Sequence, residues 1–107
     1  MNISPYDLRQ YRLMHQNIEG YQNERLSLNS LVNNLEGLSD SLENPGQVWR
    51  EEFRTLCNDL EMIHAISLDE GKGELDSIQK EIIVQTLSKL KYLIEPLILA
   101  GNTPTED

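Results

Sequence analysis

Two side chains of this sequence could take part in catalysis or metal binding: Cys57, the only cysteine, and His64, one of two histidines. A thiol is activated when an imidazole lies within hydrogen-bonding distance of the sulfur. On a helix, residues seven positions apart share a face but lie about 10 Å apart along the axis. Metal ligands on a helix are spaced by three or four residues instead. This spacing therefore predicts neither a catalytic pair nor a metal site.

Cys57 also belongs to a packing stripe. Phe53, Cys57, Leu60 and His64 recur at intervals of four and three residues, which is typical of the inward face of a helix. Because cysteine behaves as a small hydrophobic residue, we expect Cys57 in the core and His64 at the edge of the stripe. A phosphorelay role for His64 stays an alternative, although the following "AISLDEG" lacks the lysine–glycine pair of such modules.

Adjacent carboxylates could in principle support acid–base catalysis. They occur at Glu51 and Glu52, at Asp69 and Glu70, and at Glu74 and Asp76. Such chemistry needs carboxylates in an enclosed, partly apolar site, whereas these lie on a polar helix face or in a turn. The glycines of "DEGKGELD" follow neither the spacing of a phosphate-binding loop nor that of a calcium loop. We expect no enzyme activity, no cofactor and no metal.

Four helical segments must position these residues. Apolar residues recur at helical spacing over residues 5–20, 27–42, 47–69 and 77–95. Ser4 and Ser27 are candidate N-caps, "ENPG" separates the second helix from the third, and Pro96 should end or kink the fourth, after which "LILAG" adds at most one turn. The prediction is an all-α fold, a small up-and-down bundle of three to four antiparallel helices. Residues 1–100 form this single domain and residues 101–107 a disordered tail.

The expected core follows from the stripes. The second helix contributes leucines and Val32, and the third contributes Val48, Trp49, Phe53, Leu56, Cys57, Leu60 and Ile63. The fourth stripe is Ile78, Ile82, Ile83, Leu87, Leu90 and Ile94, widened by Val84 and Leu93. Because its apolar residues lie on more than one side, we expect the fourth helix to be the most buried.

The charge of the chain is uneven. Its net charge is −9, and residues 26–77 contain eleven acidic and three basic side chains, a net charge of −8. Such a field repels nucleic acid and attracts basic protein surfaces, although solubility alone could also explain it. The most apolar stretch contains charges and a proline, which excludes a membrane helix. With no leader expected and one cysteine, we expect a cytoplasmic protein.

These observations favour an interaction protein that binds a partner through spaced carboxylates. Tyr92 and Trp49 could act as aromatic anchors, although the position of Trp49 beside Phe53 is more typical of a core. The candidate partner-binding residues are Glu36, Asp40, Glu43, Glu51, Glu52, Asp59, Glu61, Asp69, Glu70, Glu74 and Asp76.

The stretch "RLSLNSLVNNLEGL" followed by "WREEFRTLCNDLEMIHAISLDEG" resembles small acidic helical immunity proteins of bacterial polymorphic toxin, contact-dependent inhibition and colicin systems. The similarity covers residues 24–94 and consists of a leucine-rich helix, a break, and an acidic helix that begins with a tryptophan. The resemblance implies binding and neutralisation of a cognate toxin, often a basic nuclease, with carboxylates in its phosphate-binding site. It identifies no individual functional residue.

A second hypothesis is a homo-oligomeric helical module with a regulatory or structural role. It is suggested by the fourth helix, whose apolar residues could leave an exposed apolar surface after the bundle closes. This hypothesis allows a homodimer. Apart from that, we expect a basic protein toxin as the partner, and we expect binding neither to nucleic acid nor to a membrane.

Overall fold

The computed structural model describes residues 3–69 and 75–102, which form helices and their connections without any strand. The helices are α1 (Pro5–Gln22), α2 (Leu28–Asp40), α3 (Gln47–Asp69) and α4 (Ser77–Asn102). The predicted all-α bundle is thus confirmed, and three of the four predicted helices end within about two residues of the observed ends, the usual uncertainty of a helix boundary.

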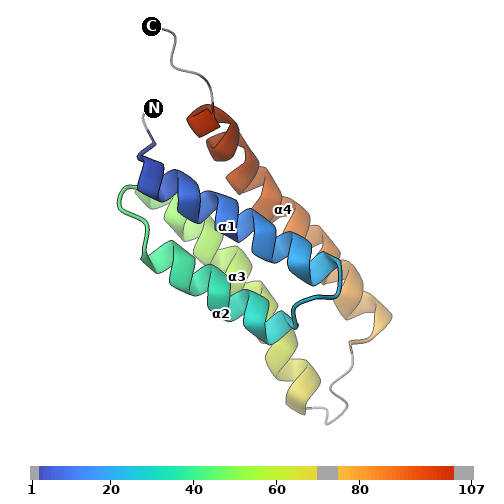
Figure 1. Ribbon diagram of the computed structural model, residues 1–107. Coiled ribbons are helices and arrows are strands. Elements are labelled where there is room, and N and C mark those ends of the chain that lie inside the picture. Colours follow the sequence, from blue (N-terminus) through green and yellow to red (C-terminus); the bar gives the residue numbers. More distant parts are fainter. Residues whose placement is uncertain (1–2, 70–74, 103–107) are drawn as a thin grey trace, which may run out of the picture.

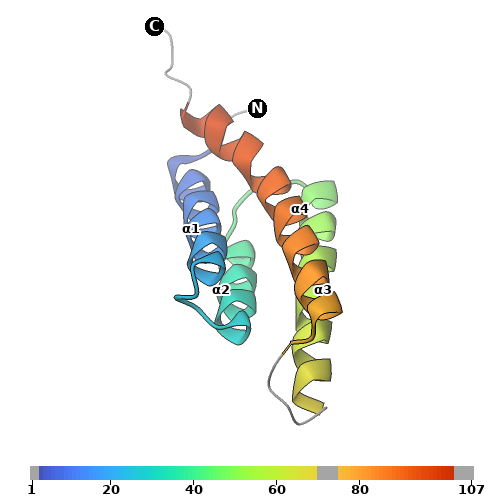
Figure 2. The same ribbon diagram turned by 90° about the vertical axis from the view of Figure 1, so that its right-hand side faces the viewer.

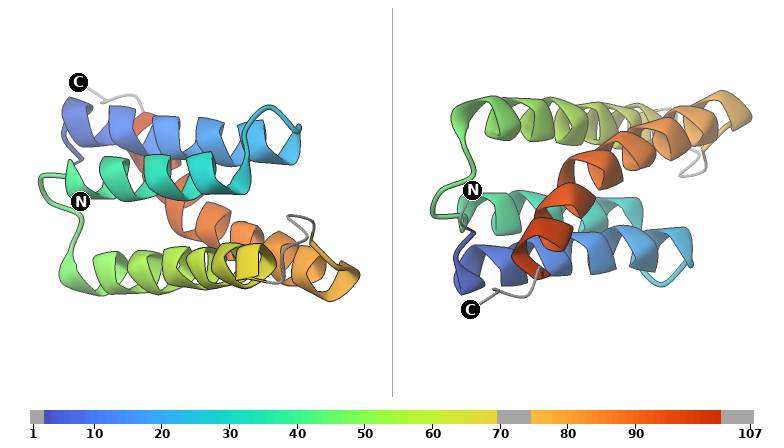
Figure 3. Two further views of the ribbon diagram at one scale, coloured as in Figure 1. Left: turned by 90° about the horizontal axis from the view of Figure 1, so that it is seen from below. Right: turned by 90° about the horizontal axis from the view of Figure 1, so that it is seen from above.

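The four helices run up and down and close into a ring (Figure 1). Each helix packs against the next along the chain, and α1 also packs against α4. The second view separates the α1–α2 pair from the α3–α4 pair (Figure 2). Seen from below and from above, α4 crosses obliquely from α3 toward α1 (Figure 3). α3 therefore has two flanks, one facing α2 and the other facing α4.

The first turns of the helices are capped by short polar side chains. The hydroxyl of Ser4 accepts a hydrogen bond from the N–H of Asp7 at 3.0 Å, and that of Ser27 accepts one from the N–H of Ser30 at 3.1 Å. These bonds satisfy N–H groups that have no partner within the helix. Before α3, Gly46 has a φ of 84°, a left-handed conformation that suits glycine, and its carbonyl accepts from Arg50 N–H. Both predicted serine caps are confirmed.

The core lies between the helices and contains most of the predicted stripes of α2 and α3, together with Tyr11, Met14 and Ile18 of α1. Its completely enclosed side chains include Phe53, Met14 and Leu60. Trp49 is half-buried and stacks on Phe53 with ring centroids 4.9 Å apart, while Tyr11 meets its edge at 5.4 Å. The indole N–H donates to the carbonyl of Leu93 at 3.0 Å, which ties α3 to α4. Trp49 therefore has the core role that its sequence position favours.

The prediction that α4 is the most buried helix is wrong. Ile83, Leu87, Leu90 and Ile94 are buried as expected, but Ile78 is 70% exposed, and Ile82 and Val84 are exposed as well. In α3, Val48 is exposed too. α4 packs only against α1 and α3, so the side that faces neither helix stays open to solvent. The apolar stripe of α4 is wider than its contacts with α1 and α3, so the side chains at the edges of the stripe stay exposed.

α4 does not end at Pro96 but continues through it to Asn102. A proline inside a helix removes one backbone hydrogen bond, at a cost of about 3 kcal/mol. Leu97 and Ile98 pack against the core beyond it, and this burial offsets the cost. A Cβ on Gly101 would meet Leu8 at 2.6 Å, so glycine permits the close approach of α4 to α1. Gly101 and Asn102, predicted in the tail, are helical, and residues 103–107 lie outside the described residues.

Candidate partner-binding surface

The candidate surface centres on α3 and its two flanks. Glu51, Glu52, Asp59 and Glu61 are all exposed on α3, which places every described acidic side chain of this helix in contact with solvent. α2 adds Glu36, which is half-buried, and Asp40, which is exposed at its end. Asp69 ends α3, but its side chain and the predicted contact residues Glu70 and Glu74 lie outside the described residues.

On the α2 flank, three carboxylates from two helices come close together. Burial raises the pKa of Glu36 above its ordinary value, and the charge of Glu61, a hydrogen bond to its carboxylate and the charge of Asp40 raise it further. These carboxylates therefore repel one another, in addition to the effect of burial on Glu36. A cation placed on this flank would relieve that repulsion.

Beneath these carboxylates lies Cys57, which is 2% exposed as its stripe predicts. Burial raises the pKa of its thiol to about 12, and the nearby Glu36 and Glu61 add to the rise. The thiol is consequently protonated at neutral pH, which makes it a poor nucleophile. A small hollow of about 290 Å³ opens above it, lined also by Ser39 and Arg54. Cys57 is a core residue of the bundle.

His64 lies half-buried at the edge of the stripe, as expected. It lines a shallow hollow with Asn33 and Glu61, and its backbone carbonyl accepts a hydrogen bond from the hydroxyl of Ser67 at 3.3 Å. The other histidine, His15, links helices instead. Its Nε2 lies 2.9 Å from Glu95 of α4 and its Nδ1 3.5 Å from Glu19.

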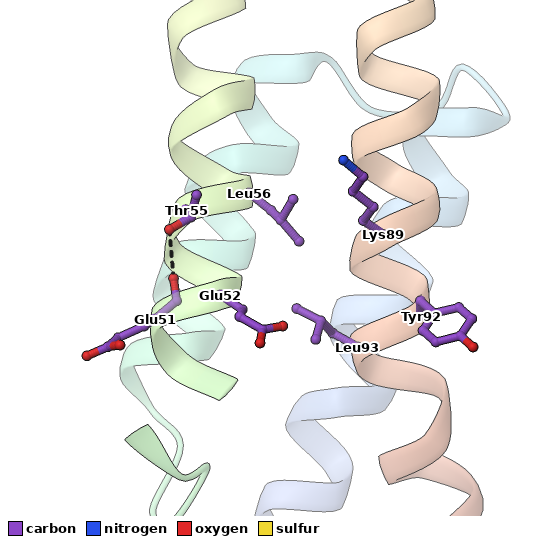
Figure 4. Close-up of a pocket in the computed structure, with 7 residues that line it drawn as sticks. All are labelled: Glu51, Glu52, Thr55, Leu56, Lys89, Tyr92 and Leu93. Atoms are coloured by element: carbon purple, nitrogen blue, oxygen red, sulfur yellow. Dashed lines mark hydrogen bonds between the residues drawn. The ribbon is translucent and has the colours of Figure 1, made fainter. Parts of the chain in front are cut away.

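On the α4 flank, α3 and α4 enclose an open groove with a volume of about 470 Å³. Leu56 and Leu93 are half-buried and point into it from opposite helices (Figure 4). Glu52 from α3 and Lys89 from α4 form its charged walls, and Tyr92 is 82% exposed at its outer edge. This flank therefore combines an apolar floor with carboxylates, a feature that the apolar stripes did not predict.

Two predicted contact residues also hold the fold together. The N–H of Glu43 donates to buried Asp7 at 2.9 Å, and its carboxylate accepts from the hydroxyl of Ser4 at 3.3 Å. The carboxylate of Asp76 caps α4 by accepting from the backbone N–H of Gln79 at 2.7 Å, and the side-chain carbonyl of Gln79 accepts from the backbone N–H of Asp76 at 3.0 Å. This reciprocal pair is a capping box, which makes Asp76 a structural residue of the helix start.

Asp7 is the polar residue that the sequence patterns missed. Its side chain is 3% exposed and accepts N–H bonds from both Glu43 and Asn44 of the α2–α3 connection. The one signal in the sequence was the position of Asp7 in the first turn of α1. An acidic residue at this position also interacts favourably with the helix dipole, so the position alone did not predict burial. Asp7 fixes the connection from which α3 begins and thus orients the surface.

Within the described residues, the acidic side chains of α2 and α3 have no basic partner. In the described part of the chain, no Lys, Arg or His nitrogen lies within 4.0 Å of Glu36, Asp40, Glu51, Glu52, Asp59 or Glu61. A side-chain amide, that of Gln47, donates to Glu51 at 3.3 Å. Among residues 3–69 and 75–102, no group of three acidic, His or Cys side chains could hold a metal ion.

Comparisons with protein families, curated proteins and solved structures found no match to this chain. None of the helices in the described ranges is long and apolar enough to cross a membrane.

Proposed function

We propose that the chain is an immunity protein, which binds a cognate basic toxin, of the nuclease class, and neutralises it by covering its active or substrate-binding site. The observation that carries this proposal is the row of carboxylates on α2 and α3 for which the described part of the chain offers no basic partner. Carboxylates left without internal counter-charges are free to pair with Lys and Arg of a partner.

A nuclease supplies the matching chemistry. Its active site gathers Lys and Arg to hold phosphates, and Arg binds a carboxylate with the same two-pronged geometry that it uses for a phosphate. The fields of an acidic inhibitor and a basic toxin also accelerate their encounter. Glu61 and Glu36 would gain most from such contact, because a partner's cation removes the repulsion between them. We place this encounter in the cytoplasm, where a toxin would meet its substrate.

The direct test is a binding and protection experiment with the C-terminal domain of a toxin encoded next to this gene. Purified together, the two proteins should form a one-to-one complex that loses affinity steeply with salt and suppresses the nuclease activity. Glu61→Lys should weaken the complex by at least about tenfold, since it replaces an attractive charge with a repulsive one. Glu81→Lys, an exposed charge reversal on α4, is the matched control.

Absence of binding at micromolar concentration and low salt would contradict the proposal. Equal losses for Glu61→Lys and Glu81→Lys would contradict the assigned surface, because net charge alone would then explain the effect. If the complex forms but the nuclease remains active, the chain binds without neutralising, and the proposed mechanism of occlusion fails.

A second candidate is a homo-oligomeric module, favoured by the large apolar side chains that remain exposed. Met62 of α3 and Ile78 of α4 are 62% and 70% exposed. Sedimentation over a wide concentration range decides this candidate. A strict monomer at high concentration and physiological salt removes it, whereas a stable dimer that dissociates on Ile78→Asp supports it.

A further inference from the structure

The groove between α3 and α4 has a distinct chemistry on the acidic surface. Leu56 and Leu93 face each other across it, while Glu51 and Tyr92 stand at opposite outer edges (Figure 4). Its volume of about 470 Å³ lies in the range of natural binding pockets, and an open groove of this size holds one large side chain together with adjoining backbone.

The polar groups around the floor are already satisfied. The hydroxyl of Thr55 donates to the carbonyl of Glu51 at 2.9 Å, and the carbonyl of Leu93 accepts from the indole of Trp49 at 3.0 Å. In the described part of the chain, no buried side-chain nitrogen or oxygen lacks a hydrogen-bond partner. The floor consequently offers apolar contact without a directional polar contact, which suits an aliphatic or aromatic side chain.

The walls determine the charge of what can enter. Glu51 and Glu52 line the groove and Asp59, two helical turns after Glu52, lies on the same flank of α3. Lys89 is the one basic residue among those that line it. A segment with positive charges on both sides of an apolar residue therefore complements the groove, whereas an acidic segment would be repelled.

A second copy of this chain fits less well. Each copy carries a net charge of −9, so two copies repel each other before any apolar contact forms. A dimer formed around Tyr92 and Lys89 would bury little apolar area, and this burial would have to offset the repulsion. A basic partner gains from the same field that opposes the dimer.

We propose that the α3–α4 groove is the anchor point of the partner, and that it receives a large apolar side chain from a Lys- or Arg-rich segment. The inference deepens the proposed function, on which it rests for the identity of the partner. The carboxylates of α3 then attract the segment and orient it, while Leu56 and Leu93 supply the apolar contact that charge alone does not give. Interfaces commonly combine such a central anchor with a polar rim.

The test uses the full chain, labelled for amide NMR, and short synthetic peptides. One peptide is lysine-rich with a central phenylalanine, the second has serine in place of the phenylalanine, and the third has glutamates in place of the lysines. The first should shift the amides around Leu56 and Leu93 and bind about tenfold or more tightly than the serine peptide. The glutamate peptide should not bind.

Two variants with matched controls check the site. Tyr92→Ala should weaken the phenylalanine peptide several-fold, and Tyr6→Ala, which removes a less exposed tyrosine on α1, should leave it unchanged. Glu52→Lys should weaken it about tenfold, more than Glu81→Lys does. Equal binding of the phenylalanine and serine peptides, or shifts confined to the α2 flank, would overturn the groove as an anchor.

Failure here is distinguishable from failure of the proposed function. If the toxin domain is bound and inhibited but Tyr92→Ala and Glu52→Lys have no effect on that complex, the groove inference fails and the function stands. If the chain instead dimerises through the groove, so that Tyr92→Ala abolishes the dimer, the occupant is a second copy and this proposal is wrong.

Discussion

The two flanks of α3 differ although they belong to one helix. On the α2 flank, Glu36, Asp40 and Glu61 crowd together above a buried thiol. On the α4 flank, Leu56 and Leu93 form the floor of a groove with charges only on its walls. The first flank offers crowded charge and little apolar contact, whereas the second adds an apolar floor to its carboxylates. Together they provide the attraction and the anchor that a protein interface needs.

The difference shows that charge repulsion and apolar exposure arise from different features of the same sequence. Neighbouring helices bring carboxylates together on one side of the stripe, where no basic side chain of residues 3–69 and 75–102 lies at pairing distance. On the other side, α4 runs obliquely to α3 (Figure 3), and Leu56 and Leu93 stay only half-buried between the two helices. The surface side chains of each flank can therefore be altered without altering those of the other.

The largest effect is expected from the residue that supports both flanks. Phe53 lines the hollow above Cys57 and stacks on Trp49, whose indole bonds the carbonyl of Leu93. Phe53→Ala should lower the free energy of unfolding by about 3–5 kcal/mol, because it opens a cavity in the core. Urea denaturation measures the loss. Val48→Ala, at a position 70% exposed, is the control and should change stability by less than about 0.5 kcal/mol.

A loss of under about 1 kcal/mol for Phe53→Ala would show that the two flanks do not share this support. Equal losses for Phe53→Ala and Val48→Ala would contradict the burial of the stripe itself.

The next effect concerns the thiol under the α2 flank. Because burial and two nearby carboxylates raise the pKa of Cys57 to about 12, the folded chain should react with a thiol reagent at least about a thousandfold more slowly than the unfolded chain. The rate is followed at mildly alkaline pH with and without denaturant. Fast labelling of the folded chain would show that the thiol is accessible and the α2 flank is open.

The smallest effect separates the flanks by pH. The pKa of Glu36 is raised in the folded state, so the folded chain binds a proton more readily than the unfolded chain, and the charged carboxylate destabilises the fold at neutral pH. Glu36→Gln should therefore stabilise the chain by about 0.5 kcal/mol at neutral pH. Below the ordinary glutamate pKa the gain should vanish, because the wild type is then protonated as well.

Stability of both variants is measured by urea denaturation across this pH range, with Glu81→Gln as the exposed control on α4. A gain that persists unchanged at acidic pH would mean that shape rather than charge explains it. A loss at neutral pH would mean that the carboxylates of the α2 flank do not repel each other.

Helical periodicity was sufficient to predict most of the fold. The caps at Ser4 and Ser27, the buried Cys57 and the edge position of His64 all follow from spacing and residue type. These features are local, since each depends on neighbours within one or two helical turns. Such local features can therefore be predicted from a single sequence.

The features that periodicity missed depend on contacts between distant segments. Asp7 is buried because it receives N–H bonds from a connection more than thirty residues later, and Pro96 stays helical because Leu97 and Ile98 beyond it reach the core. Exposure of Ile78 depends on which side of α4 has a neighbour. The contact residues themselves remain predictions, because exposure and charge identify a surface but not its partner.

The central claim is that a partner covers the carboxylates on both flanks of α3. Carbodiimide labelling of carboxyl groups, read by mass spectrometry, measures this directly on the chain alone and in complex with the toxin domain. Glu36, Asp40, Glu51, Glu52, Asp59 and Glu61 should lose reactivity in the complex, whereas Glu19, Glu81 and Glu95 should keep it. Unchanged labelling of the first group, or protection of the second group alone, would contradict the claim.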